Sequence, residues 1–330
     1  MVTLSTEKED WGFVCGQVSV LEGGLLPRDF FQSLAGVEKL DDLLHRLQDT
    51  PLRDFVTPGA SWEEWNDIVD QHFRHEMLAV RANSPSDAVA GLFLLPGDYL
   101  NLKRALLRLG SYPFPANLFS EERLAAAAAG DVGGLPQDLR MTLARLGGSP
   151  SDDPAARASL DAALDGAYLR HMLDLAAGLD IPMITAYVDD LVLSRAVTML
   201  WRAARSGQPL KALEDHVTPL GGHTHIIRGL LSAGDPRGWG AVVPGVVGDC
   251  LRQALESADE DPVQAFELHT SNALMNFAKG AKLQTMGPER VAGYFVGLKA
   301  QVFNLKLVIS GRFNGIDPEM LRRRLRECYV

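Results

Sequence analysis

The chain has 330 residues, of which 46% are hydrophobic and 22% are charged, as in an ordinary folded protein. Its formal net charge of −10 argues against a nucleic-acid-binding surface and against electrostatic attraction to anionic lipid. The cysteines Cys15, Cys250 and Cys328 share no CxxC spacing and are odd in number, which argues against a disulfide framework or a zinc site. Since no signal peptide and no apolar run of ~18 residues is present, we expect a cytoplasmic protein without direct membrane insertion.

Helical periodicity begins in the first third of the chain. Residues 26–52 contain two short amphipathic segments. Residues 61–82 follow, and Ser61 and Glu64 at their start have the spacing of a capping box. The sequence predicts a helix over residues 97–110, with Asp98 near its start and Gly110 where a glycine commonly ends a helix.

The rest of the chain continues the same pattern. Further helices are predicted over residues 120–130, 134–148, 153–180, 188–207, 287–311 and 315–330. In the last of these, Asp317 is expected to cap the helix and Pro318 fits its first position. Residues 239–250 form the only stretch with a strand-like pattern. The sequence therefore predicts an all-α fold.

Two distant stretches, residues 98–110 and 301–315, share a motif in which Asn-Leu-Lys follows a polar residue three positions before the Asn. The motif residues are Asp98, Asn101 and Lys103 in the first stretch, and Gln301, Asn304 and Lys306 in the second. On a regular helix Arg108 would share a face with Asp98 and Asn101.

A second likeness links Asp70 to Asp165, because each precedes an aromatic residue by three positions and a Met-Leu pair by seven. A looser copy starts at Glu267. Together with the first motif, this spacing predicts three related helical units, with the chain ends able to exchange between them. Their expected ranges are 1–113, 114–206 and 207–330.

The asparagine of the motif invites two interpretations. Asn is mediocre inside a helix, so a side chain kept there is expected to hydrogen-bond a neighbouring helix end or loop. One interpretation is a structural polar clamp within each unit, and the other is a contact to a partner. We favour the clamp and expect Asn101→Leu to cost ~1–3 kcal/mol of stability.

Motifs for chemistry are missing from the sequence. The histidine pairs His72/His75 and His223/His225 do not match a metal-binding pattern. No phosphate-binding glycine loop and no GxSxG motif occurs. We therefore expect no catalytic residues, no metal and no cofactor.

The basic cluster near the C-terminus consists of Arg322, Arg323, Arg324 and Arg326. It fits a solvated helix face and equally fits a surface that steers toward an acidic partner. The sequence does not choose between these interpretations.

Several of these stretches resemble the C subunit of archaeal and bacterial A/V-type rotary ATPases, a relative of the eukaryotic subunit d. The resemblance rests on residues 18–34, 98–108, 298–317 and 321–330 and extends over nearly the whole chain. Gln301 stands where that family often has an acid, and the second unit carries Val192 or Leu193 in place of the Asn.

The resemblance implies a funnel or socket of three similar helical domains with pseudo-threefold symmetry. One copy per complex would sit on the cytoplasmic face of the proteolipid ring and receive the foot of the central stalk, with its D- and F-type subunits. It would transmit torque for ATP-linked proton or sodium transport without chemistry of its own. The alternatives are a free-standing helical-repeat scaffold that binds a peptide or protein in a groove and, more weakly, an enzyme with a site dispersed over three units.

Overall fold

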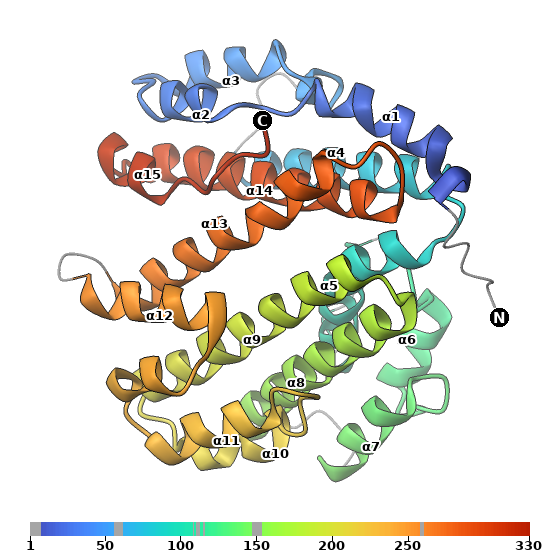
Figure 1. The fold of residues 1–330 in the computed structure, drawn as a ribbon, viewed down its shortest axis with the longest axis vertical. Coiled ribbons are helices and arrows are strands. Elements are labelled where there is room, and N and C mark those ends of the chain that lie inside the picture. The colour runs from blue at the N-terminus through green and yellow to red at the C-terminus, as the bar shows by residue number, and fades with distance from the viewer. Residues whose placement is uncertain are drawn as a thin grey trace. The chain divides into compact units, whose positions relative to one another are not determined.

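The computed structural model describes residues 8–55, 62–107, 109, 113–114, 116–146, 154–257 and 261–330. Figure 1 shows a chain built from successive helices. Within the described residues no strand forms, and an isolated β-bridge joins Leu220 to Gly222. The predicted all-α class is therefore confirmed.

The chain divides into two compact units. Unit 1 combines residues up to 90 with residues 271–330, and unit 2 contains residues 91–270. The prediction of three units, with boundaries after residues 113 and 206, stays a prediction.

Unit 1 joins the two ends of the sequence. Its helices are η1 (Lys8–Trp11), α1 (Gly12–Glu22), α2 (Arg28–Ala35), α3 (Leu40–Gln48), η2 (Pro51–Asp54), α4 (Trp62–Ala82), the second half of α13 (Pro262–Lys282), α14 (Pro288–Phe313) and α15 (Pro318–Arg324). Helix α14 packs against α1, α2, α4 and α15. The core between them contains Phe31 and Leu34 of α2, Trp65 of α4 and Leu305 of α14, each at most 1% exposed. Burial of these apolar helix faces is the main force that holds the ends of the chain together.

Helix α15 approaches α14 closely because Gly311 has no side chain. A Cβ atom at this position would lie 2.3 Å from Cδ2 of Leu321, which is fully buried. The predicted cap of α15 is confirmed, since the Asp317 carboxylate accepts the backbone N–H groups of Glu319 and Met320 at 2.9 and 3.1 Å. Close packing and the cap fix the orientation of this short helix.

Unit 2 is built around long helices. It contains most of α5 (Ala88–Leu106), then α6 (Glu121–Ala128), α7 (Gln137–Arg145), α8 (Pro154–Leu179), α9 (Pro182–Arg205), η3 (Leu210–Leu213), α10 (Glu214–Val217), α11 (Thr224–Ala233), η4 (Pro236–Ala241), α12 (Gly245–Glu256) and the first half of α13. Helix α8 packs against α7, α9 and α10. The rings of Trp201, Trp239 and Phe266 pack together, with ring centroids 6.3 and 5.9 Å from that of Trp201.

Three sequence expectations need comment. Helix α5 begins at Ala88, about two and a half turns before the predicted start, and contains Pro96. The strand-like residues 239–250 form the end of η4 and the start of α12. Ser61 and Gly110, the predicted cap and helix-ending glycine, lie outside the described residues.

Candidate functional site

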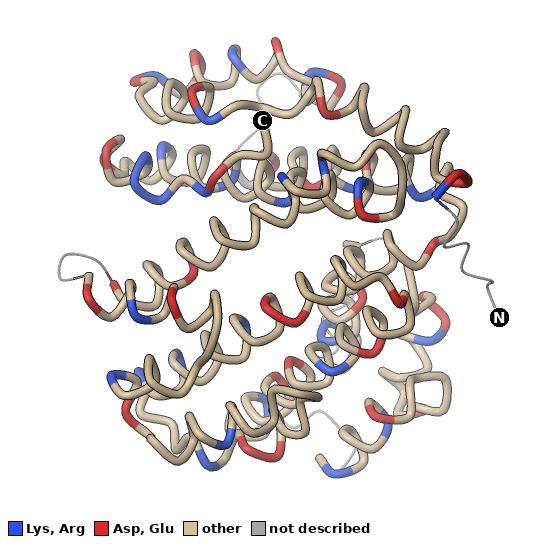
Figure 2. The backbone as a smooth tube through the Cα atoms, viewed as in Figure 1, with Lys and Arg blue, Asp and Glu red and all other residues tan. Residues whose placement is uncertain are grey.

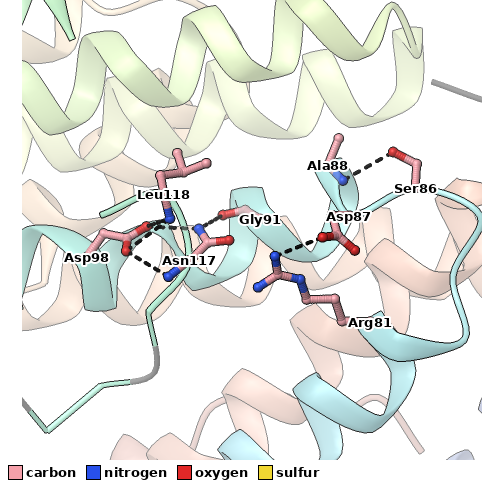
Figure 3. A network of polar contacts seen from close by, with 8 residues as sticks. All are labelled: Arg81, Ser86, Asp87, Ala88, Gly91, Asp98, Asn117 and Leu118. Atoms are coloured by element: carbon pink, nitrogen blue, oxygen red, sulfur yellow. Dashed lines mark hydrogen bonds and ion pairs between the residues drawn. The ribbon is translucent and has the colours of Figure 1, made fainter. Parts of the chain in front are cut away.

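Asp98 lies on α5, and its side chain is almost completely buried. Its carboxylate accepts backbone N–H groups from Asn117, Leu118 and Phe119, the segment that leads into α6. The side-chain amide of Asn117 donates to Asp98 at 2.8 Å and to the carbonyl of Gly91 at 3.0 Å (Figure 3). Burial raises the pKa of Asp98, while these donors oppose the rise. The carboxylate thus fastens the segment before α6 to α5.

Asn101 fastens the same segment one helical turn further along α5. Its Nδ2 atom donates to the carbonyl of Phe114 at 2.9 Å, and its Oδ1 atom accepts the N–H of Phe114 at 3.3 Å. The side chain is 2% exposed, so both of these groups are satisfied inside the protein. We call Asp98 and Asn101 the α5 clamp.

The second motif does the same work in unit 1. Gln301 on α14 accepts the backbone N–H of Leu26 at 2.7 Å, just before α2. Asn304 accepts the N–H of Arg326 at 2.9 Å and donates to the carbonyl of the same residue at 3.0 Å. We call Gln301 and Asn304 the α14 clamp. In both clamps the first residue holds the entry to a short helix, and the Asn pairs with one residue's backbone from both sides.

The lysines of the two motifs are also matched. Lys103 on α5 pairs with Asp161 and Asp165 on α8, at 2.6 and 2.8 Å. Lys306 on α14 pairs with Asp70 on α4 at 2.7 Å. Asp70 and Asp165 are the residues that the sequence comparison had aligned, so each repeated lysine meets a repeated aspartate.

Burial alone would lower the pKa of Lys103, but its hydrogen bonds to both aspartates raise the pKa above its usual value. The remaining predicted motif residue, Arg108, lies outside the described residues. The other motif side chains contact their own unit, as a structural clamp requires.

The four C-terminal arginines have different surroundings. Arg322 donates from Nε to the carbonyl of Gln32 at 3.1 Å and forms an ion pair with Glu319. The guanidinium of Arg326 lies 3.3 Å from the centroid of the Phe303 ring. Arg323 and Arg324 are exposed. Arg322 and Arg326 thus have contacts within unit 1, whereas Arg323 and Arg324 face solvent.

A polar pocket of about 720 Å³ lies between α2, α3 and α15. It is lined by Ser33, Gly36, Val37, Glu38, Asp42, His45, Arg46 and Arg322. The negative charges of Glu38 and Asp42 equal in number the positive charges of Arg46 and Arg322, so the pocket has no marked excess of either sign. Among all the described residues, those of the pocket included, no group of three His, Cys, Asp or Glu side chains could hold a metal ion.

Sequence reasoning missed a buried polar cluster around Glu22, which is 7% exposed. Its carboxylate pairs with Arg290 at 2.8 Å and accepts a hydrogen bond from the Tyr329 hydroxyl. One signal existed, because Glu22 continues the buried helical series of Val14 and Val18 at a spacing of four. An acid in such a series needs buried partners.

Replacing either clamp asparagine with leucine should lower the free energy of unfolding by ~1–3 kcal/mol, because a buried backbone N–H and C=O lose their partners. Asn101→Leu tests the α5 clamp and Asn304→Leu the α14 clamp, both by urea denaturation. Asn314→Leu is the control: its side chain donates to the Ser310 carbonyl at an exposed helix end, where water can replace the bond, so the loss should be smaller. Unchanged stability together with loss of partner binding would instead make the clamp a contact surface.

The buried His72 on α4 should make the folded protein less stable at acidic pH. Its side chain is buried beside the Phe55 ring, and burial, together with nearby His75, lowers its pKa to about 4. Between pH 6.5 and 4 the unfolded chain binds a proton at His72 that the native protein does not bind. The free energy of unfolding therefore decreases as the pH is lowered through this range, by at most about 3 kcal/mol.

Urea titrations at pH 7 and pH 4.5 should therefore show a smaller loss for His72→Gln than for the wild type. Burial also lowers the pKa values of His171 and His216, so part of the pH dependence should remain in this variant. His225→Gln, at an exposed position, should behave as the wild type. If His72→Gln loses as much stability between pH 7 and pH 4.5 as the wild type, His72 is not a source of the acid sensitivity.

Comparison with known proteins places the chain. A model of the ATP synthase (C/AC39) subunit family matches residues 14–324. No curated protein matches the chain significantly. None of the described helices is long and apolar enough to cross a membrane. The family resemblance predicted from the sequence is confirmed by the match, which includes both clamps and all of α15. The chain therefore belongs to the ATP synthase (C/AC39) subunit family, whose members are subunits of rotary ATPases.

Proposed function

We propose that this chain is a non-catalytic adapter in the central stalk of a V/A-type rotary ATPase. It links stalk subunits of the D and F type to the membrane proteolipid ring, as a peripheral subunit on the cytoplasmic face. The observation that carries the proposal is the family match, which extends from residue 14 to residue 324.

We further propose that three similar helical units form the body of the adapter as a funnel with pseudo-threefold symmetry. The two clamps support this arrangement, since each has a polar residue three positions before an Asn, and both residues bind backbone groups of their own unit. Unit 1 combines α2 to α4 with α14 and α15, which fits the expectation that the chain ends exchange between repeats.

The mechanism is mechanical. An adapter must pass torque between its partners without yielding, so the entries to its short helices must be held firmly. Buried carboxylate and amide side chains do this in both units, because the hydrogen bonds that Asp98, Asn101 and Asn304 make in a low-dielectric core fix one arrangement.

Affinity purification of the tagged full-length chain from native membranes tests the proposal. Co-purification of D- and F-type subunits with the proteolipid ring is the expected result, in about one copy per complex. Recovery of soluble partners alone would favour a free-standing helical-repeat scaffold instead. Measured turnover by the purified chain would refute a non-catalytic role.

A second measurement tests whether the chain couples ATP hydrolysis to ion transport. Membranes that lack this chain should retain ATP hydrolysis in the catalytic subunits but lose ATP-driven ion uptake. Adding back the purified chain should restore uptake. Uptake that is unaffected by the loss of the chain would contradict an adapter role.

A further inference from the structure

Helix α15 presents a defined outer face. Leu321 and Leu325 at its inner side are 0% and 1% exposed, and the helix packs on α2 and α14. Met320 lies on the opposite side with 47% of its surface exposed, and Arg323 and Arg324 follow three and four residues later, also exposed. Residues at these spacings are neighbours on one helix face. We call Met320, Arg323 and Arg324 the α15 face.

The acids near the α15 face are already engaged. Asp317 caps the helix, Glu319 pairs with Arg322, and Glu327 pairs with Lys279. Arg323 and Arg324 have no ion pair with any residue that the structure describes. Figure 2 shows the basic stretch at the end of α15 in blue. The α15 face therefore carries two uncompensated positive charges in a chain whose net charge is −10.

The composition of the α15 face is that of a protein interface. Arg and Met are enriched where proteins bind one another, and the cap and buried leucines hold this face rigid before any partner arrives. We propose that the α15 face binds an acidic segment of another rotary-ATPase subunit, with carboxylates at Arg323 and Arg324 and an apolar side chain over Met320. This inference rests on the proposed function.

Other charged partners fit less well. Recognition of anionic lipid by sequence commonly needs clusters of about four to eight basic residues, and the α15 face has two that are unpaired. The net charge of −10 opposes approach to a lipid surface and to nucleic acid alike. A short acidic protein segment needs only the local charges.

Charge reversal with a matched control tests the proposal. The probe is the detergent-solubilised ATPase purified from cells that lack this chain, fixed to a biolayer-interferometry tip. The full-length wild type is compared with R323E/R324E and with K211E/R237E. Lys211 and Arg237 are exposed residues of unit 2, so the control has the same change in net charge.

R323E/R324E should associate about tenfold or more slowly than the wild type at low salt, and the gap should shrink at high salt as the charges are screened. Dissociation should change less. R323Q/R324Q should give an intermediate rate, and K211E/R237E should match the wild type. Thermal midpoints should differ little among the four proteins, because the changed side chains are exposed and the glutamates in the last turn of α15 meet only the screened field of the helix end.

The outcomes separate the two proposals. Wild-type binding with equal rates for both charge-reversed variants would overturn the α15 face and leave the adapter function standing. Absence of wild-type binding would overturn both. Binding of the wild type to phosphatidylserine vesicles, lost in R323E/R324E, would assign the arginines to lipid and overturn the protein partner.

Discussion

Gly166→Ala should destabilise unit 2 by about 3 kcal/mol or more, because overpacking against backbone cannot relax by moving a side chain. Gly166 lies in α8 where the helix packs against α10. A Cβ atom there would lie 1.8 Å from the carbonyl oxygen of His216 and 2.7 Å from its carbon. Both partners are main chain, so α10 would have to move away from α8. Thermal and urea unfolding measure the effect.

Gly178→Ala, in the same helix, is the control. A Cβ atom at Gly178 has no neighbour within 4 Å, so alanine should stabilise the helix by up to ~1 kcal/mol. The two substitutions are chemically identical and should act in opposite directions. Equal effects would show that helix propensity rather than the close approach decides at Gly166.

Patterns along the chain predicted the local features of this protein well. The all-α class follows from helical periodicity, and the cap at Asp317 follows from Asp-Pro-Glu chemistry. The predicted start of α5 at residue 97 was wrong, since the helix continues through Pro96, where a proline normally marks a boundary. Here Val89, Leu92 and Leu95 before or beside it are at most 1% exposed, and their burial outweighs the ~3 kcal/mol that an internal Pro costs.

Partners of the polar side chains were harder to foresee. A helical Asn or buried Asp signals that a partner exists, but periodicity does not say which backbone supplies it. Asp98 binds residues 117–119, which have no regular pattern, and Gln301 binds Leu26 across 275 positions of sequence. Such long-range pairs are set by how the whole core packs, and one sequence carries little trace of them.

Tyr329→Ala should lower the free energy of unfolding of unit 1 by about 3–5 kcal/mol, as much as Gly166→Ala lowers that of unit 2. The substitution removes a buried aromatic ring and takes a hydrogen-bond donor away from the buried Glu22 carboxylate. The ring is 5% exposed, with the ammonium of Lys282 4.9 Å from its centroid. Its hydroxyl donates to Glu22, whose remaining partner is Arg290. Truncation would leave a cavity in the packing of the tail and a carboxylate that is only half satisfied.

Two further variants separate these causes. Tyr329→Phe keeps the ring and removes the hydroxyl, so it should cost about 1.5–3 kcal/mol, the range for a hydrogen bond to a charged group. Val330→Ala, at a neighbouring side chain that is 40% exposed, should change stability by less than about 0.5 kcal/mol.

If Tyr329→Ala costs no more than Val330→Ala in urea unfolding, the C-terminal tail does not hold unit 1 together. The expected order, with Ala above Phe above the Val330 control, would instead mean that the last residues of the chain fasten α14 to α1. The two ends of the sequence would then be held together in unit 1 by the buried Tyr329 ring and its hydrogen bond to the Glu22 carboxylate, as well as by apolar packing.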